Sequence, residues 1–235
     1  MTNPIYVSID TTDVAKAQSL AKTLVGAVGG IKLGLEFFMA QGPQGIQQVA
    51  TGGLPLFVDV KLHDIPNTVA GAMRGVVRLN SNIVTIHASG GSEMIKAAVD
   101  AAQDEAAKLG IKSPRVIAVT VLTSLDQSAL DVMGVTRPVV DQVVSLAKMT
   151  LEAGADGVVC SPHEVAAIRS ALGSKPFLVV PGIRPAGVDV GDQKRVMTPA
   201  QAMNAGADIL VIGRPITQSP DPVAAAEAIF RDLSA

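Results

Sequence analysis

Short hydrophobic runs rich in β-branched residues alternate about eight times with alanine-rich stretches of helical periodicity. The hydrophobic runs predict strands at residues 5–9, 30–33, 56–61, 83–87, 115–122, 157–160, 177–181 and 209–212. The stretches between them predict helices near residues 12–28, 36–51, 69–79, 92–109, 138–153, 163–171, 199–204 and 222–233.

Alternation of strands and helices is typical of a parallel sheet covered by helices, so the pattern predicts an α/β fold. Eight repeats within 235 residues favour a closed (β/α)₈ TIM barrel that forms a single domain over residues 1–235. An open, doubly wound sheet stays an alternative, because alternation alone does not establish closure. A Gly-x-Gly-x-x-Gly turn does not follow the first predicted strand, which gives a dinucleotide-binding fold little support.

Composition narrows the classes of function. A net charge of −2 and only six aromatic residues, five Phe and one Tyr, argue against a surface for nucleic acid or membrane. The hydrophobic runs are much shorter than the roughly 20 residues of a membrane span, and the N-terminus lacks the features of a signal peptide. One cysteine, Cys160, and three scattered His make a zinc site improbable. These features predict a cytoplasmic protein without a metal.

Charged residues lie at or near the carboxyl ends of the first three predicted strands. Asp10 ends the first strand, Lys32 lies in the second, and Asp59 and Lys61 lie in the third. Active groups of a (β/α)₈ barrel gather at this end of the strands. Single polar residues there are often helix caps, as we expect for Ser124 and Ser161, but four charges of alternating sign on three neighbouring strands favour a functional site.

The segment DVKLHDIPNT, residues 59–68, joins the third strand to an amphipathic helix. Alternation along a strand places Asp59 and Lys61 on the same face as Phe57. Burying such charges is costly unless they are paired or used in chemistry. One interpretation is an Asp59–Lys61 ion pair, with Asp64 or Asn67 capping the next helix. The other is a catalytic array.

Two segments near the C-terminus predict a phosphate site. PGIRPAGVDVGDQKR, residues 181–195, is a long loop that contains Arg184 and Gln193, and the eighth strand runs into Gly213 and Arg214. Long loops in compact barrels are commonly functional, arginine forms charge-assisted bonds with phosphate, and phosphate sites after strands seven and eight recur in this fold.

These motifs resemble those of orotidine 5′-phosphate decarboxylases, in their bacterial, freestanding form. DVKLHDIPNT matches almost letter for letter, and PGIRPAGVDVGDQKR with VIGRP matches strongly. Asp10, GGIKLG and VTVLTS match more weakly. The resemblance covers the whole predicted barrel. It implies that the chain converts orotidine 5′-monophosphate (OMP) to uridine 5′-monophosphate (UMP) and CO₂ without a cofactor or metal.

The resemblance also implies a role for each matching residue. Lys61 would protonate C6, Asp59 would lie beside the substrate carboxylate, and Lys32 and Asp10 would bind the ribose hydroxyls. Asp64, Ile65 and Thr68 would reach the neighbouring subunit's site in a homodimer. The remaining matches face the pyrimidine (Thr123) or bind phosphate and close the loop (Arg184, Gln193, Gly213 and Arg214).

Two other functions are compatible with parts of the pattern. Barrels with Asp-x-Lys-x-x-Asp include 3-keto-L-gulonate 6-phosphate decarboxylases and hexulose 6-phosphate synthases, which use magnesium to stabilise an enediolate. The full decamer and the GIRP…GDQ loop favour the nucleotide enzyme. A catalytically inactive phosphate-binding protein on the same barrel is the second alternative, and the presence of every charged position argues against it.

Overall fold

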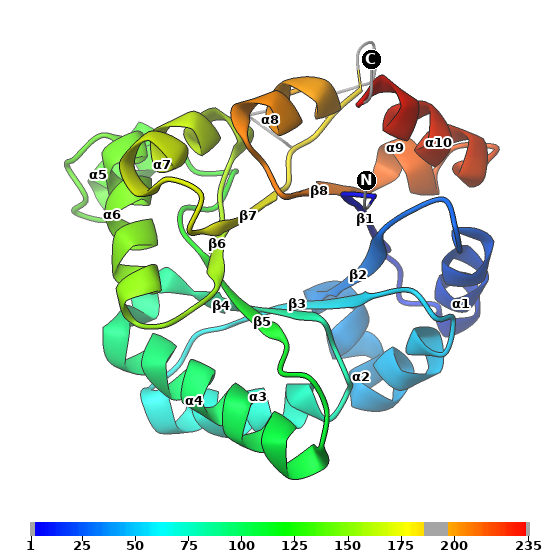
Figure 1. The fold of residues 1–235 in the computed structure, drawn as a ribbon, viewed down its shortest axis with the longest axis horizontal. Coiled ribbons are helices and arrows are strands. Elements are labelled where there is room, and N and C mark those ends of the chain that lie inside the picture. Colours follow the sequence, from blue (N-terminus) through cyan, green and yellow to red (C-terminus); the bar gives the residue numbers. More distant parts are fainter. Residues whose placement is uncertain (1–2, 186–196, 234–235) are drawn as a thin grey trace.

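A computed structural model describes residues 3–185 and 197–233, and it shows a closed barrel of parallel strands. Each strand pairs with its sequence neighbours, and the last pairs with the first (Figure 1). The strands are β1 (Ile5–Ser8), β2 (Gly30–Gly34), β3 (Leu56–Leu62), β4 (Ile83–His87), β5 (Arg115–Val119), β6 (Gly157–Val159), β7 (Phe177–Val180) and β8 (Ile209–Ile212). The (β/α)₈ prediction is confirmed, and the open sheet is excluded.

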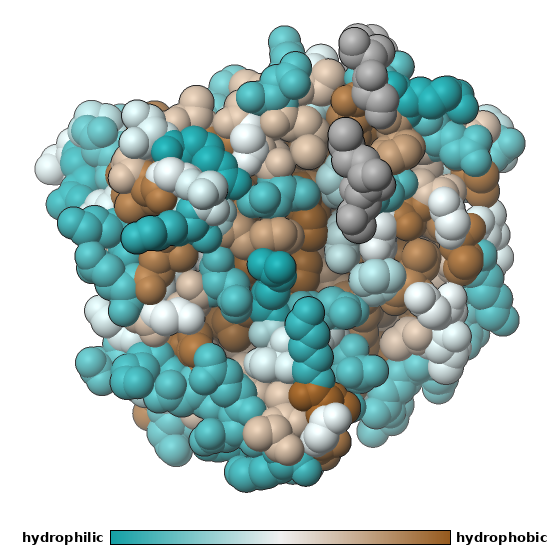
Figure 2. All heavy atoms as spheres, viewed as in Figure 1, coloured by the Kyte–Doolittle hydropathy of each residue, from teal (hydrophilic) through white to brown (hydrophobic). Residues whose placement is uncertain are grey.

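Helices surround the barrel (Figure 1). They are α1 (Val14–Thr23), α2 (Leu35–Ala50), α3 (Pro66–Val77), α4 (Gly91–Leu109), α5 (Gln127–Val132), α6 (Val139–Glu152), α7 (Val165–Leu172), α8 (Pro199–Ala205), α9 (Arg214–Thr217) and α10 (Pro222–Asp232), with 3₁₀ turns η1 (Ala88–Gly90) and η2 (Pro162–Glu164). Figure 2 shows that the outer helices present mainly hydrophilic side chains on the face drawn, with hydrophobic ones in the gaps between them. Within the described residues, none of these helices is long and apolar enough to cross a membrane.

The hydrophobic core has two parts, because each strand has an inner and an outer face. The larger cluster joins strand residues such as Val58 and Leu210 to helix residues such as Met73 and Ile168. The smaller cluster contains residues of strands alone, among them Phe57 and Ile117. It therefore fills the inside of the barrel. A large hydrophobic side chain contributes about 1.5–3 kcal/mol when it is fully buried, so this packed interior gives the strand ends a rigid base.

Several predicted boundaries are wrong by a few residues. The helix predicted at 12–28 begins only at Val14, because the Asp13 side chain accepts a hydrogen bond from the Lys16 amide and caps it, and it ends at Thr23. The strand predicted at 115–122 ends at Val119, where the chain leaves the barrel. The helix predicted at 69–79 begins at Pro66, a residue suited to a first helical position. The short helix α5 was not predicted, and α9, which begins at Arg214, falls outside the predicted helix ranges.

Candidate active site

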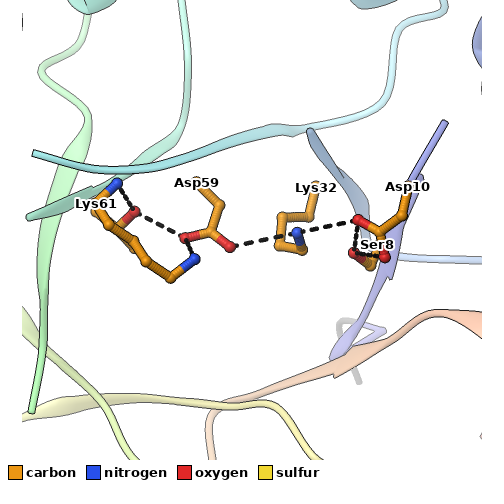
Figure 3. Close-up of polar contacts among 6 residues, drawn as sticks. Ser8, Asp10, Lys32, Asp59 and Lys61 are labelled. Atoms are coloured by element: carbon orange, nitrogen blue, oxygen red, sulfur yellow. Dashed lines mark hydrogen bonds and ion pairs between the residues drawn. The ribbon is translucent and has the colours of Figure 1, made fainter. Parts of the chain in front are cut away.

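Three neighbouring strands carry the predicted charged residues into one line. Parallel pairing sets Ser8 beside Lys32 and Gly34 beside Asp59, so the ends of β1, β2 and β3 are adjacent. Figure 3 shows Asp10, Lys32, Asp59 and Lys61 in this order, pointing toward one another. The structure therefore brings together the four charged residues that the sequence pattern singled out.

The line alternates in charge along its whole length. Lys32 Nζ lies 3.6 Å from Asp10 Oδ1 and 3.3 Å from Asp59 Oδ2. The other Asp59 oxygen, Oδ1, accepts a hydrogen bond of 2.8 Å from Lys61 Nζ. At the outer end, the hydroxyl of Ser8 lies 2.8 and 2.9 Å from the two carboxylate oxygens of Asp10. The central carboxylate is therefore bound by an ammonium group on each side.

Asp59 is the electrostatic centre of this arrangement. It is only 8% exposed, and burial by itself would raise the pKa of its carboxyl group. The charges of Lys32 and Lys61, with hydrogen bonds from Lys61 and Thr85, outweigh burial and hold that pKa below its usual value. Asp59 is therefore a carboxylate at neutral pH, with a fixed negative charge inside the barrel mouth.

Lys61 has an unusual backbone. Its φ is 49°, in the left-handed region that residues other than glycine rarely adopt. Such outliers cost on the order of 1–3 kcal/mol and cluster at functional sites.

His87 ends β4, and its ring centroid lies 5.2 Å from that of His63. Burial, followed by the charges of His63 and Lys61, lowers the pKa of His87, so its ring is neutral at pH 7.

A cavity of about 510 Å³ opens above the charged line, a size typical of small-molecule sites. Its charged wall comes from β1–β3, and its other wall is formed by hydrophobic residues of β5–β8 such as Val119 and Val211. Eight of the predicted site residues line it: Asp10, Lys32, Asp59, Lys61, Thr123, Arg184, Gly213 and Arg214. One cavity thus combines the charged array with the two arginines predicted to bind phosphate.

The two arginines follow different strands. Arg184 lies just after β7, where its backbone amide donates a hydrogen bond to the Met197 carbonyl oxygen at 3.0 Å. Its guanidinium Nη1 donates to the carbonyl oxygen of Ile183 at 2.9 Å. Arg214 is the first residue of α9, directly after Gly213. Both side chains contribute to the same cavity, so together they could bind one dianionic group.

Sequence comparisons identify the family of this barrel. Residues 3–229 match the model of the orotidine 5′-phosphate decarboxylase / HUMPS family. An orotidine 5′-phosphate decarboxylase of Paramagnetospirillum magneticum is 61% identical over 99% of this chain and 99% of its own length. The chain belongs to this family. The enzyme of the same name from Rhodospirillum rubrum is 54% identical and covers 98% of this chain and 94% of its own.

Solved structures in the family have the same architecture. The crystal structure of orotidine 5′-phosphate decarboxylase from Lactobacillus acidophilus aligns with a TM-score of 0.84 and 37% identity, over 99% of this chain and 100% of that one. The family resemblance inferred from the sequence motifs is therefore confirmed. Because relatives match at nearly full length, the barrel as a whole is the unit that the family shares.

Three of the predicted residues lie outside this cavity. Asp64, Ile65 and Thr68 surround the start of α3, are exposed, and do not line the cavity of their own chain. The Asp64 carboxylate accepts a hydrogen bond from the Ile65 amide at 2.7 Å and does not cap the helix, since Ile65 holds the N-cap position. The interpretation of Asp64 or Asn67 as the helix cap is therefore wrong, because Asn67 lies inside α3 and its N-cap has no side-chain cap hydrogen bond. Gln193 lies outside the described residues.

Three residues of the site were missed. Ser8 donates a hydrogen bond to Asp10 and could have been found, because it ends β1 two positions before Asp10. Gln218 follows the short helix α9 and lines the cavity, and no sequence motif pointed to it. Thr85 donates to Asp59 from the neighbouring strand β4. That contact depends on strand pairing, which residue types alone do not reveal.

Proposed function

We propose that this chain decarboxylates OMP to UMP and CO₂, the last step of UMP synthesis. The observation that supports it best is the line Lys32–Asp59–Lys61, which lies in a cavity that also contains Arg184 and Arg214. A nucleotide fits this arrangement, because its phosphate can bind the arginines while its base faces the charged line. Relatives more than 50% identical carry the name orotidine 5′-phosphate decarboxylase.

The chemistry explains why the line needs a lysine. Loss of CO₂ from C6 leaves a carbanion in an sp² orbital that is orthogonal to the ring π system, so the ring does not delocalise it. In our proposal the ammonium group of Lys61 stabilises this charge and donates its proton to C6. Asp59 keeps Lys61 Nζ in place through their 2.8 Å hydrogen bond.

Asp59 has a second effect, on the substrate carboxylate. Two unit charges about 4 Å apart at an effective dielectric constant near 20 repel by roughly 4 kcal/mol. Release of that repulsion as CO₂ departs would accelerate the reaction about a thousandfold. The repulsion must be offset by binding energy from distant parts of the substrate. The phosphate contacts of Arg184 and Arg214 supply it in this proposal, with Lys32 and Asp10 on the ribose.

A homodimer completes the site in our proposal, with Asp64, Ile65 and Thr68 of each chain reaching the partner's cavity. Two observations support this arrangement. Asp64 and Thr68 are exposed, and Ile65, a large hydrophobic residue, is 67% exposed at the start of α3. All three lie outside the cavity of their own chain.

Mixed dimers test the shared site. Lys61→Ala and Asp64→Asn proteins are each expected to be nearly inactive. When they are mixed and allowed to exchange subunits, one site in each heterodimer contains both intact residues, so about a quarter to a half of the wild-type activity per site should return. Confirmed heterodimers without activity would show that Asp64 acts within its own chain, whereas a fully active Asp64→Asn protein would show that Asp64 has no role in the site.

The central experiment follows the orotate absorbance while purified protein reacts with OMP in EDTA. Loss of absorbance with formation of UMP supports the proposed reaction. A reaction that requires added magnesium would instead favour a magnesium-dependent sugar-phosphate reaction, and unchanged OMP would favour an inactive phosphate-binding protein. The single-domain organisation and the cytoplasmic location stay predictions.

A further inference from the structure

Thr85 lies in the middle of β4 and has no exposed surface. Its hydroxyl group makes two hydrogen bonds to β3. Oγ1 accepts one from the backbone amide of Lys61 at 3.0 Å and donates one to Asp59 Oδ1 at 2.8 Å. The directions are unambiguous, because an amide N–H only donates and a carboxylate only accepts. A single hydroxyl therefore joins the backbone of the proposed proton donor to the carboxylate beside it.

The pairing of β3 with β4 explains why a side chain is needed here. Val58 pairs with Val84 and Leu62 pairs with Ile86, so β3 advances four residues (62 − 58) while β4 advances two (86 − 84). The two additional residues of β3 break the regular ladder, and Lys61 within this irregularity is left-handed. Its amide is bound by the Thr85 hydroxyl.

The Thr85 hydroxyl also fixes the position of the Asp59 carboxylate. Asp59 Oδ1 receives both the Thr85 hydroxyl and Lys61 Nζ, each at 2.8 Å. The position of that oxygen determines where Lys61 Nζ lies. Thr85 itself lies on β4, which pairs regularly with β5 on its other side. Other buried threonines bond differently. Thr120 donates to the backbone carbonyl oxygen of Val159, and within the described chain Thr150 Oγ1 has no hydrogen-bond partner.

We propose that Thr85 is a positioning residue for proton transfer, which holds the left-handed backbone of Lys61 and the carboxylate of Asp59 in one fixed relation. This inference rests on the proposed decarboxylation, in which Lys61 is the proton donor. Thr85 itself does not touch the substrate, since it does not line the cavity. It acts through the two residues that do.

Three variants separate positioning from packing. Thr85→Val keeps the shape of the side chain and removes both hydrogen bonds, whereas Thr85→Ser keeps the hydroxyl and removes a methyl group. Thr150→Val is the matched control, because it makes the same change at a buried threonine without a hydrogen-bond partner in the described structure. If Thr85→Val does not fold, Thr85→Ala replaces it, since alanine removes the hydroxyl without adding a methyl group.

The expected result is a fall in kcat of roughly 10- to 100-fold for Thr85→Val, as for small misplacements of catalytic groups. KM should change by less than about threefold, because the phosphate contacts are intact. Thr85→Ser should keep kcat within about threefold of wild type. Thr150→Val should leave it unchanged. Wild-type kcat in Thr85→Val, or equal losses in the valine and serine variants, would overturn the proposal.

The pKa of Asp59 gives a second readout. Lys32 on β2, Lys61 on β3 and His87 on β4 all face Asp59 and are retained in the variant. Loss of the Thr85 hydrogen bond should raise the pKa of Asp59 and move the acid limb of the kcat/KM profile to higher pH. Carbon NMR titration of the Asp59 carboxyl group measures the same shift without turnover. A wild-type protein inactive on OMP would disprove the proposed function, whereas an unshifted Asp59 pKa in Thr85→Val would disprove this inference.

Discussion

The two ends of the cavity are built in different ways. At the end proposed to hold the reacting atoms, called the reacting end, Asp59 and Lys32 are each 8% exposed and lie in paired strands. Asp59 forms ion pairs with both Lys32 and Lys61. At the end proposed to bind the phosphate, called the phosphate end, Arg184 and Arg214 follow β7 and β8, and Arg214 is exposed. In the proposed reaction, the strands therefore hold the charges nearest the reacting atoms, and the segments after strands hold the arginines that would bind the phosphate.

This difference fits the division of work that the reaction requires. Electrostatic stabilisation of a transition state depends on charges that are fixed before the reaction begins. A network of neighbouring strands provides that fixation, at the cost of burying the charges of Lys32 and Asp59 and of a left-handed backbone at Lys61. Contacts to a distant phosphate need less exact positions, because the phosphate contributes binding energy and takes no part in the bond-breaking step. The comparison therefore predicts large effects on kcat at one end and effects on binding at the other.

The largest effect is expected for Lys61→Ala. Removal of the ammonium group eliminates both the proton donor and the positive charge beside the carbanion, so kcat should fall by more than about 10⁴-fold. The measurement is single-turnover conversion of OMP. Circular dichroism and binding of UMP serve as controls for the fold and for the phosphate end. Activity within tenfold of wild type would remove Lys61 from the donor role.

Arg214→Ala is expected to affect the other end. Loss of a charge-assisted bond to phosphate costs about 1.5–3 kcal/mol, so kcat/KM for OMP should fall by roughly 10- to 100-fold, with a marked rise in KM. Part of the loss should appear in kcat, because phosphate binding also offsets the repulsion at the reacting end.

Orotidine without its phosphate is the control for Arg214→Ala. The variant and the wild type should react equally slowly with it, because neither can use the missing contact. If the wild-type protein converted orotidine as fast as OMP, phosphate binding would not lower the barrier at the reacting end, and the two ends of the cavity would not be coupled.

The sequence predicted the reacting end in most respects. Alternation along β3 correctly placed Asp59 and Lys61 on the face of Phe57, and strand order correctly brought Lys32 and Asp10 beside them. It did not reveal the irregular pairing of β3 with β4 or the contacts of Thr85, because a strand pattern does not encode local slips in register. The left-handed backbone of Lys61 was equally unforeseen.

The start of α3 shows another limit. A carboxylate ahead of a helix is a common capping signal, yet Asp64 bonds to the adjacent Ile65 amide and Pro66 begins the helix. Sequence spacing does not determine which of several nearby amides a short side chain will bind. The family resemblance predicts a role for Asp64 in a second subunit, and a single chain contains no contact that could decide it.

Gly34→Ala is expected to have a smaller effect, again at the reacting end. A Cβ atom at Gly34 would lie 2.9 Å from Lys32 Nζ, so the ammonium group must move away. The end of a lysine side chain moves at little cost, and the free energy of unfolding should change by less than about 1 kcal/mol. The kcat/KM for OMP should nevertheless fall by about tenfold.

Gly52→Ala is the matched control, because a Cβ atom there meets only atoms at 3.6 Å or more and lies away from the cavity. Thermal unfolding and steady-state kinetics of both variants make the comparison. If Gly34→Ala destabilised the fold strongly or left kcat/KM unchanged, the position of Lys32 would be less restricted at the reacting end than the structure indicates.

The smallest expected effect concerns stability in acid. The folded-state pKa of Asp59 is lowered, because the charges of Lys32 and Lys61 and two hydrogen bonds outweigh burial. The carboxylate therefore stabilises the fold fully at pH values above its unfolded pKa of about 3.9, and this contribution is lost as the pH falls through the folded pKa. Each unit of lowering corresponds to about 1.4 kcal/mol.

Asp59→Asn removes this titration and keeps the shape of the side chain. The difference in unfolding free energy between wild type and Asp59→Asn should shrink steadily as the pH falls below about 4. Urea unfolding at one fixed protein concentration measures it, since association of subunits would otherwise alter the midpoint. A difference that stays constant or grows toward low pH would show that the ammonium groups do not stabilise Asp59. Strand packing alone would then hold the Asp59 side chain in its position at the reacting end.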